Sequence, residues 1–335
     1  MSGAIIHTAN LSIGYTHRKE EYVVQNKLNL NVFRGELVCL IGPNGCGKST
    51  LLRSLAGLQP VLQGEIIIEG RPIGKQTLKD KARLIGLVLT DRVEVSNITV
   101  YQLIALGRNP YTDWLGNLSN EDTEKIQTAI EQVHLKGYEQ RFLSELSDGE
   151  RQRTMIAKAL VQDTPVILLD EPTAHLDLPN RVEIMILLRS LAKKTNKAVV
   201  LSTHELDLAL QASDKLWLMS PKGGIAVGTP EDLILSNHLQ QVFANNSFYF
   251  DNKTGNFVMK HVDSPRTVSL VTKGEGDRTF WTQRALTRNG YQFSDQSSFI
   301  VTVDEDQNIW TLSAPQLNKQ VDSLEELLAL LAPLM

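Results

Sequence analysis

The sequence has little cysteine and no long hydrophobic run. Its only two cysteines, Cys39 and Cys46, lie close together along the chain, which fits neither a disulfide framework nor a set of metal ligands. No apolar stretch approaches the roughly 20 residues that span a bilayer, and the N-terminus lacks a signal-peptide pattern. We therefore expect a protein that stays in the cytoplasm with reduced thiols.

A strong charge of one sign is also missing. The chain has 34 Lys and Arg against 38 Asp and Glu, a formal net charge of −4. Proteins that coat nucleic acid carry an excess of positive charge, so no nucleic-acid partner is expected. Hydrophobic residues make up 42% of the chain and charged residues 21%, which is ordinary for a soluble globular protein and excludes a disordered or fibrous class.

Short apolar runs alternate with amphipathic stretches over roughly the first 250 residues. This alternation predicts an α/β domain with a largely parallel sheet, with buried strands at 36–41, 166–169 and 198–202 and helices at 49–58 and 181–194. Between residues 100 and 160 strand signals give way to helical periodicity. We expect an inserted helical subdomain at about 93–160, within a domain that covers 1–255.

The composition becomes more polar after Phe250, and residues 263–335 predict a separate small α+β domain. The pattern indicates strands at 267–272, 299–303 and 308–312 and helices at 278–288 and at the C-terminal end, where Ser323 opens a capping box. No catalytic motif occurs there. We expect an accessory module that regulates activity or stabilises a dimer, with passive packing as the alternative.

A phosphate-binding loop follows the first predicted strand. The segment reads Gly42-Pro43-Asn44-Gly45-Cys46-Gly47-Lys48-Ser49-Thr50, which fits GxxxxGK[ST] between a strand and a helix,. Glycines let successive N–H groups surround an anion at the helix N-terminus. We expect Lys48 to reach the β- and γ-phosphates of ATP and the Ser49 hydroxyl to ligate Mg²⁺. A redox-sensing role for Cys46 would need the helix N-terminus to lower the pKa of its thiol.

Two adjacent carboxylates end the strand at 166–169. Side chains of adjacent strand residues diverge, so Asp170 is expected to hold Mg²⁺ and Glu171 to deprotonate the attacking water. His204 follows the strand at 198–202 and is a candidate for contacting the γ-phosphate and that water. We assign catalytic roles to Glu171, His204 and Lys48.

These motifs resemble the ABC transporter ATPase family, and the resemblance covers about residues 4–250. The segment Leu146-Ser147-Asp148-Gly149-Glu150-Arg151-Gln152-Arg153 is similar to the family signature LSGGQ and lies before the acidic strand end. The resemblance implies a P-loop NTPase core in which two copies pair head to tail, so that Ser147 and Gly149 bind the γ-phosphate of the ATP on the other copy's Lys48 loop. It also implies that Asp177, in a segment like the D-loop, crosses the dimer interface, and that His204 is the family's switch histidine.

Tyr15 matches the aromatic residue that stacks on adenine in this family, and Tyr22 is the alternative. Segments 106–111, 114–116 and 206–210 are similar to ATPases that drive import of iron-siderophore complexes, haem or cobalamin. The alternative for their aromatic residues is packing of the helical subdomain. The resemblance implies a peripheral ATPase on the cytoplasmic face of the inner membrane that works with a membrane permease and, indirectly, a periplasmic substrate-binding protein.

The sequence departs from the family pattern in two places. Asp91 stands where a glutamine usually precedes the helical subdomain, and its carboxylate could contact the nucleotide or water on Mg²⁺. Asp148 and Glu150 replace the usual glycine and glutamine of the signature. Two alternative functions follow. One is a soluble ABC ATPase of DNA repair or translation, and the other, motivated by these departures, is a weakly hydrolysing ATP-binding regulator.

Overall fold

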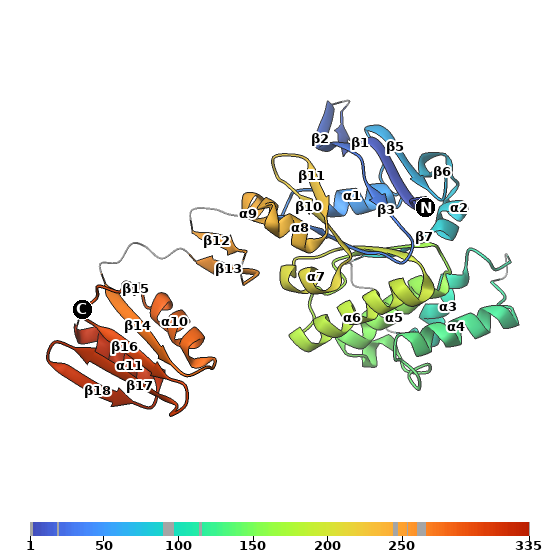
Figure 1. Ribbon diagram of the computed structural model, residues 1–335. Coiled ribbons are helices and arrows are strands. Elements are labelled where there is room, and N and C mark those ends of the chain that lie inside the picture. The colour runs from blue at the N-terminus through green and yellow to red at the C-terminus, as the bar shows by residue number, and fades with distance from the viewer. Residues whose placement is uncertain are drawn as a thin grey trace. The chain divides into compact units, whose positions relative to one another are not determined.

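The computed structural model describes residues 3–18, 20–89, 97–113, 116–243, 247–252, 254–259 and 266–334. The chain divides into two compact units, one made of Met1–Ala244 with Phe250–Asn256 and the other of Asn245–Tyr249 with Phe257–Met335. Figure 1 labels the elements of both units. No helix in the described ranges has both the length and the apolar character needed to cross a membrane.

A six-stranded sheet forms the centre of the first unit. Its strand order is β11 (Ile225–Gly228), β10 (Lys215–Met219), β4 (Leu37–Ile41), β9 (Ala198–Ser202), β8 (Val166–Asp170) and β7 (Ile85–Val88). All neighbours are parallel except β10 and β11. Every residue of β4, β8 and β9 is buried, as expected for strands covered on both faces. The predicted α/β class is confirmed.

A second, antiparallel sheet covers one side of this core. It has the order β2 (Glu20–Leu28), β1 (Ile6–His17), β5 (Gln63–Ile68) and β6 (Arg71–Pro72), and β3 (Asn31–Val32) also pairs with β1. Helix α1 (Lys48–Leu55) contributes Leu51, Leu52 and Leu55 to the apolar cluster between the sheets. The helix ends before the predicted residue 58, because Gly57 has a left-handed φ of 66° that breaks the helix,.

Helices cover the other side of the parallel sheet (Figure 1). They are α3 (Val100–Ala105), α4 (Asn120–Gln132), α5 (Asp148–Val161), α6 (Leu178–Thr195) and α7 (Leu206–Ala212), with the short turns η2 (Leu106–Arg108) and η3 (Leu143–Glu145). The remaining elements of the unit are η1 (Ile73–Lys75), α2 (Leu78–Leu84), α8 (Pro230–Leu235) and α9 (His238–Phe243). A hairpin of β12 (Phe248–Asp251) and β13 (Asn256–Met259) follows them.

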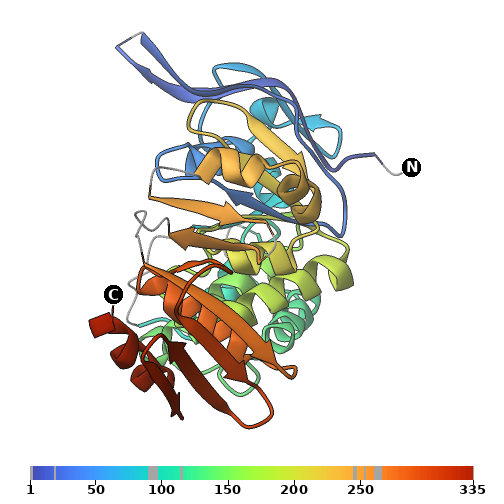
Figure 2. The same cartoon turned by 60° about the vertical axis from the view of Figure 1, so that its left-hand side comes forward.

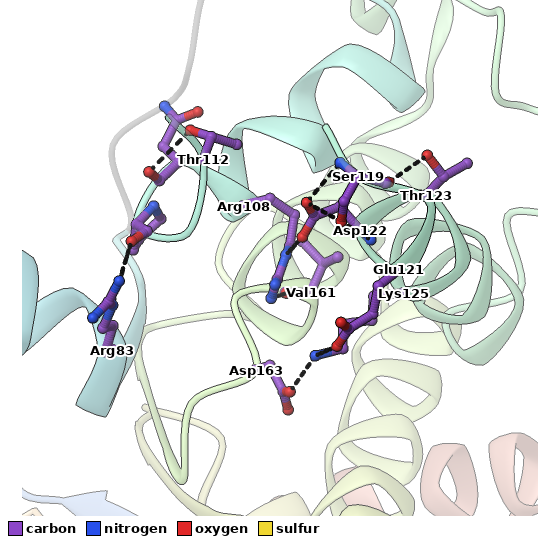
Figure 3. A network of polar contacts seen from close by, with 12 residues as sticks. Arg83, Arg108, Thr112, Ser119, Glu121, Asp122, Thr123, Lys125, Val161 and Asp163 are labelled. Atoms are coloured by element: carbon purple, nitrogen blue, oxygen red, sulfur yellow. Dashed lines mark hydrogen bonds and ion pairs between the residues drawn. The ribbon is translucent and has the colours of Figure 1, made fainter. Parts of the chain in front are cut away.

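The helical insertion is held by an ion pair buried between its helices. Arg108 Nε lies 2.6 Å from Asp122 Oδ1, and Arg108 Nη1 donates to the Val161 carbonyl at 3.0 Å (Figure 3). The Tyr111 ring stacks on the same guanidinium, with 4.1 Å between Cζ and the ring centroid. Arg108 and Tyr111 belong to the segment that resembles iron-siderophore ATPases, and here they pack the subdomain.

The second unit has a mixed sheet with the order β15 (Gln292–Phe293), β14 (Thr267–Lys273), β16 (Ile300–Asp304), β17 (Ile309–Ala314) and β18 (Leu317–Val321). Figures 1 and 2 show this sheet with its helices α10 (Arg278–Arg288) and α11 (Leu324–Leu331), which is followed by the turn η4 (Ala332–Leu334). Val268, Val301, Leu312, Leu286 and Leu327 share its separate apolar core. The predicted small α+β module is confirmed, although strand β18 was not predicted.

Candidate nucleotide-binding site

The loop between β4 and α1 has the backbone of a phosphate cradle. Gly45 and Gly47 have φ angles of 77° and 106°, in the left-handed region that favours glycine. A Cβ at Gly47 would lie 2.3 Å from Val24 Cγ1, so no side chain fits there. Gly47 caps the N-terminus of α1, where the N–H groups of the first turn are available to an anion.

Lys48 lies against this loop and is only 6% exposed. Its Nζ donates to the carbonyl oxygens of Gly42 at 2.9 Å and Pro43 at 3.2 Å. An ammonium group has three donors, so it can bind a phosphate oxygen while both bonds persist. The lysine therefore brings a positive charge to the cradle.

Ser49, Asp170 and Ser202 form a hydrogen-bonded group beside the loop. The hydroxyls of Ser49 and Ser202 donate to Asp170 Oδ1 at 3.1 and 2.6 Å. A hydroxyl and a carboxylate are ligands that Mg²⁺ prefers, usually together with substrate phosphates and water. Among the described residues no group of three or more His, Cys, Asp and Glu could hold a metal ion. The Ser49 hydroxyl and the Asp170 carboxylate fit a Mg²⁺ ion by the chemistry of their oxygen atoms,.

Glu171 and His204 meet at the same edge of the sheet. Glu171 Oε1 lies 2.7 Å from His204 Nε2, and the Glu171 N–H donates to Ser202 Oγ at 2.9 Å. Glu171 has a left-handed φ of 49°, a strained backbone that is typical of functional positions. The next residue after the histidine, Glu205, pairs with Arg181 of α6 at 2.6 Å.

Tyr15 and Tyr22 lie directly opposite each other in the register of β1 and β2. Both rings are half exposed, at 51% and 55%. The Tyr15 hydroxyl is 2.6 Å from Thr50 Oγ1 at the start of α1, whereas the Tyr22 hydroxyl bonds to Glu20. Tyr15 is therefore the tyrosine fixed next to the phosphate loop.

Ser147, Gly149 and Asp177 belong to a second cluster, at the N-termini of α5 and α6. The Ser147 N–H and hydroxyl both donate to Glu150 Oε2 at 2.8 Å. Asp177 Oδ1 accepts from Asn180 Nδ2 at 2.5 Å, and a Cβ at Gly149 would lie 2.5 Å from Asn180 Oδ1. Within the described part of the chain, no hydrogen bond joins these three residues to the Lys48 loop.

Glu150, which replaces the usual glutamine of the signature, keeps its negative charge. Hydrogen bonds from Ser147 lower the pKa of Glu150, so its carboxylate is ionised at neutral pH. Glu150 also completes the capping box of α5 with Ser147,. The side chain that replaces the usual glutamine therefore supports the helix and adds a negative charge beside Ser147.

The lowered pKa that a redox-sensing Cys46 would need is not found. Burial raises the pKa of the Cys46 thiol, and the attraction of Lys48 for the thiolate only partly offsets this. Cys46 is 4% exposed as a residue, and a buried apolar setting disfavours the reactive thiolate. A redox-sensing Cys46 loses its physical basis.

Some predicted positions lie outside the described residues, including Asp91 and, in the segment that resembles iron-siderophore ATPases, Trp114 and Leu115. Other residues near the site were missed by the sequence reasoning. Ser202 and Arg181 reach Asp170 and Glu205 only through the register of neighbouring strands and helices. Ser202 lies opposite Asp170 in the register of β8 and β9, which the sequence does not show.

Fold and site together define a P-loop ATPase, in which a phosphate cradle, a lysine and two strand-end carboxylates share one edge of a parallel sheet. The family description "ABC transporter" matches residues 25–174, and "Iron ABC transporter C-terminal domain" matches residues 266–332. The chain belongs to the ABC transporter family, as an ATP-binding, ATP-hydrolysing subunit.

Curated relatives match between 68% and 86% of this chain. The chain is 38% identical over 289 residues to the uncharacterized ABC transporter ATP-binding protein MJ0873 of Methanocaldococcus jannaschii, covering 86% of this chain and 97% of the relative. It is 38% identical to the petrobactin import ATP-binding protein FpuC of Bacillus anthracis, over 68% of this chain and 84% of that one. The iron(3+)-hydroxamate import ATP-binding protein FhuC of Bacillus subtilis is 35% identical, over 71% of this chain and 87% of that protein.

A solved structure has the same fold in a dimeric state. It is a post-hydrolysis state of the ATP-binding cassette MJ0796, bound to ADP and Pi. The TM-score is 0.59 at 26% identity, and the match covers 67% of this chain and 98% of that one. The fold described here is thus one that holds nucleotide and pairs with a second copy in that relative.

Proposed function

We propose that this protein energises the import of an iron-siderophore complex through a membrane permease. The observation that carries the ATPase part is the shared sheet edge where Lys48, Asp170 and Glu171 converge. The substrate class is supported by the names of FpuC and FhuC and by the iron transporter C-terminal domain at 266–332. Haem and cobalamin are the alternative substrates that the sequence resemblance implies.

Each residue at the edge has a role that its chemistry suits. Mg²⁺ would be held by Ser49 and Asp170, and it would neutralise charge on the β- and γ-phosphates. Glu171 accepts a proton from the water whose oxygen attacks the γ-phosphorus, and ADP leaves with the electrons of the broken bond. His204 holds the Glu171 carboxylate at 2.7 Å, while Lys48 stabilises the charge of the transferring group and Tyr15 stacks on adenine.

The second cluster supports a head-to-tail dimer. Ser147 and Gly149 lie at the N-terminus of α5, where N–H groups attract an anion,. In the dimer they bind the γ-phosphate on the partner's loop, and Asp177 lies at the interface. Gly149 leaves the space that the Asn180 side chain fills, so the start of α6 packs closely against the start of α5.

The proposal includes partners and a location. The ATPase domain, residues 1–255, sits on the cytoplasmic face of the membrane and contacts the permease through the helical subdomain, about 93–160, and through Asp91. A periplasmic binding protein delivers the iron complex to the permease. Residues 263–335 form an accessory module that regulates the ATPase or stabilises its dimer.

Uptake in the source organism tests this function. A strain without this protein is given a ferric siderophore as its only iron source, and accumulation of radioactive iron is measured with the wild-type chain or Glu171→Gln restored. We expect uptake only with the wild-type chain, at equal protein levels. Normal uptake in the deletion strain, or full rescue by Glu171→Gln, would contradict the proposal. Copurification with nucleic acid instead of a permease would favour a DNA-repair or translation ATPase.

A further inference from the structure

Gln25 is a buried polar residue in a strand that is otherwise mostly exposed. Its residue exposure is 1%, and its neighbours along β2, from Glu20 to Val23, are exposed. A buried amide that lacks hydrogen bonds destabilises a protein, so the hydrogen-bond partners of Gln25 explain why it is tolerated there.

The Gln25 amide connects three segments of the chain. Nε2 donates to the carbonyl oxygens of Cys46 at 3.2 Å and Ser220 at 2.9 Å. Oε1 accepts from the Gly224 N–H at 2.6 Å. Two acceptors face the nitrogen and one donor faces the oxygen, so the orientation of the amide is fixed by its partners. One side chain thus joins β2, the phosphate loop and the turn after β10.

The bond to the Cys46 carbonyl acts on the Cys46–Gly47 peptide, one residue before Lys48. The Cys46–Gly47 bond is trans, so its C=O and N–H point in opposite directions. Because Gln25 on β2 binds the carbonyl oxygen, the Gly47 N–H of the same peptide is turned away from the Gln25 amide. Val24, the residue before Gln25, packs on Gly47 from the same strand.

The turn after β10 supports the loop at a second point. A Cβ at Gly42 would lie 2.5 Å from the Met219 carbonyl oxygen, so the start of the loop packs on the backbone at the end of β10. Ser220, the next residue, shares the Gln25 amide with Cys46. The end of β10 therefore supports the phosphate loop directly at Gly42, and the turn at 220–224 supports it at Cys46 through Gln25.

We propose that Gln25 is a positioning residue for nucleotide binding. It sets the orientation of the Cys46–Gly47 peptide, so that the Gly47 N–H faces the phosphates, and it ties this orientation to the turn at 220–224. The inference deepens the proposed function, because it concerns the same ATP site. It predicts that losing the amide weakens binding of the phosphates without changing the catalytic pair of Glu171 and His204.

The test is the affinity of the full chain for Mg-ADP, measured by calorimetry for wild type, Gln25→Met and Thr8→Val. Methionine keeps the length of the side chain but has no N–H donor. Thr8 is a matched control, because its fully buried hydroxyl donates to the Leu28 carbonyl and accepts from the Leu30 N–H. Both variants lose buried hydrogen bonds near β2, but only Gln25→Met frees the phosphate loop.

We expect Gln25→Met to raise the Kd for ADP about tenfold, equivalent to ~1.4 kcal/mol, and to raise KM for ATP similarly with kcat within about twofold. The shift of the Gly47 backbone amide NMR signal on ADP binding should shrink. Thr8→Val should lower the melting temperature while its ADP affinity stays at the wild-type value. Wild-type affinity in folded Gln25→Met, or equal loss in Thr8→Val, would overturn the proposal. ADP binding needs neither hydrolysis nor import. The affinity measurement therefore tests the role of Gln25 even if the proposed import function proves wrong.

Discussion

Glu171 and His204 face each other at 2.7 Å, each just beyond the end of a neighbouring parallel strand, β8 and β9. The left-handed backbone at Glu171, with φ at 49°, redirects the chain directly after Asp170. Asp170 can therefore stay with the hydroxyls of Ser49 and Ser202 while Glu171 turns to the histidine. The two carboxylates have separate surroundings, which is what separate roles in metal binding and proton transfer require.

The first prediction concerns the histidine of this pair. His204→Ala removes the group that holds the Glu171 carboxylate, and we expect the ATPase rate to fall about 100-fold, within the range for acid–base positioning. Nucleotide affinity should stay within about threefold of the wild-type value. Phosphate release by the purified chain is the measurement. His7→Ala is the control, because the His7 ring bonds to Asn31 and not to Glu171. A wild-type ATPase rate in His204→Ala would contradict the proposed role of His204 in holding the Glu171 carboxylate.

Stability should depend on pH through Asp122. Burial alone would raise the pKa of this carboxyl, but hydrogen bonds from Ser119 and Arg108 outweigh it and lower the pKa to about 2. A group with a lowered folded pKa stabilises the fold above its unfolded pKa, about 3.9, and the contribution is lost as pH falls from about 4 to about 2. Urea unfolding between pH 6 and pH 3 measures this loss.

The matched variant is Asp122→Asn. It leaves the buried Arg108 guanidinium without its carboxylate, and we expect a loss of about 3 kcal/mol at pH 7 together with a flatter dependence below pH 4. Glu124→Gln, at an exposed position of the same helix, should keep wild-type stability and the wild-type pH dependence. An unchanged pH profile in Asp122→Asn would show that the acid sensitivity comes from other groups.

Neither cysteine should react readily in the folded protein. Burial raises the pKa of Cys39 to about 12 and also raises the pKa of Cys46, so both remain thiols at pH 7.5. Alkylation by iodoacetamide, followed by mass spectrometry, should be at least about tenfold slower than in urea-unfolded chain. Fast modification of Cys46 before unfolding would restore the redox interpretation that its burial argues against.

The acid in the signature should weaken dimer closure. The ionised Glu150 holds the Ser147 hydroxyl at 2.8 Å and places negative charge where the partner's γ-phosphate is proposed to bind. We expect Glu150→Gln to lower the ATP concentration needed for dimerisation by about two- to fivefold, because the amide keeps the capping position without the charge. Size-exclusion chromatography of chains that also carry Glu171→Gln measures it. A higher ATP requirement would mean that the carboxylate helps closure.

Local sequence patterns predicted much of the fold of the first unit and many of the residues at its candidate site. The strand–loop–helix around Lys48 and the acidic end of β8 follow from short-range periodicity and motif spacing, so the parallel core and the residues at its edge could be named in advance. Strand β18 was missed because Asn318, Lys319 and Gln320 are polar and exposed. Its pairing depends on β17 next to it, which no local pattern records.

Contacts between distant segments could not be predicted from the sequence for the same reason. Gln25 meets Ser220 across 195 positions, and Ser202 meets Asp170 across 32. A redox role for Cys46 stayed open in the sequence because the helix N-terminus could be seen there, whereas the burial that raises the pKa of its thiol could not. Asp91 lies outside the described residues, so its role in coupling stays a prediction.

The rate of ATP hydrolysis by Glu171→Gln tests the central claim most directly. Purified wild-type and variant chains are compared in Mg-ATP, with ATP binding measured in parallel to verify the intact cradle around Lys48. The account predicts that the variant binds ATP within about threefold of wild type and hydrolyses it at least about 100-fold more slowly. Equal rates in the two chains would contradict the assignment of Glu171 as the base and, with it, the proposed mechanism.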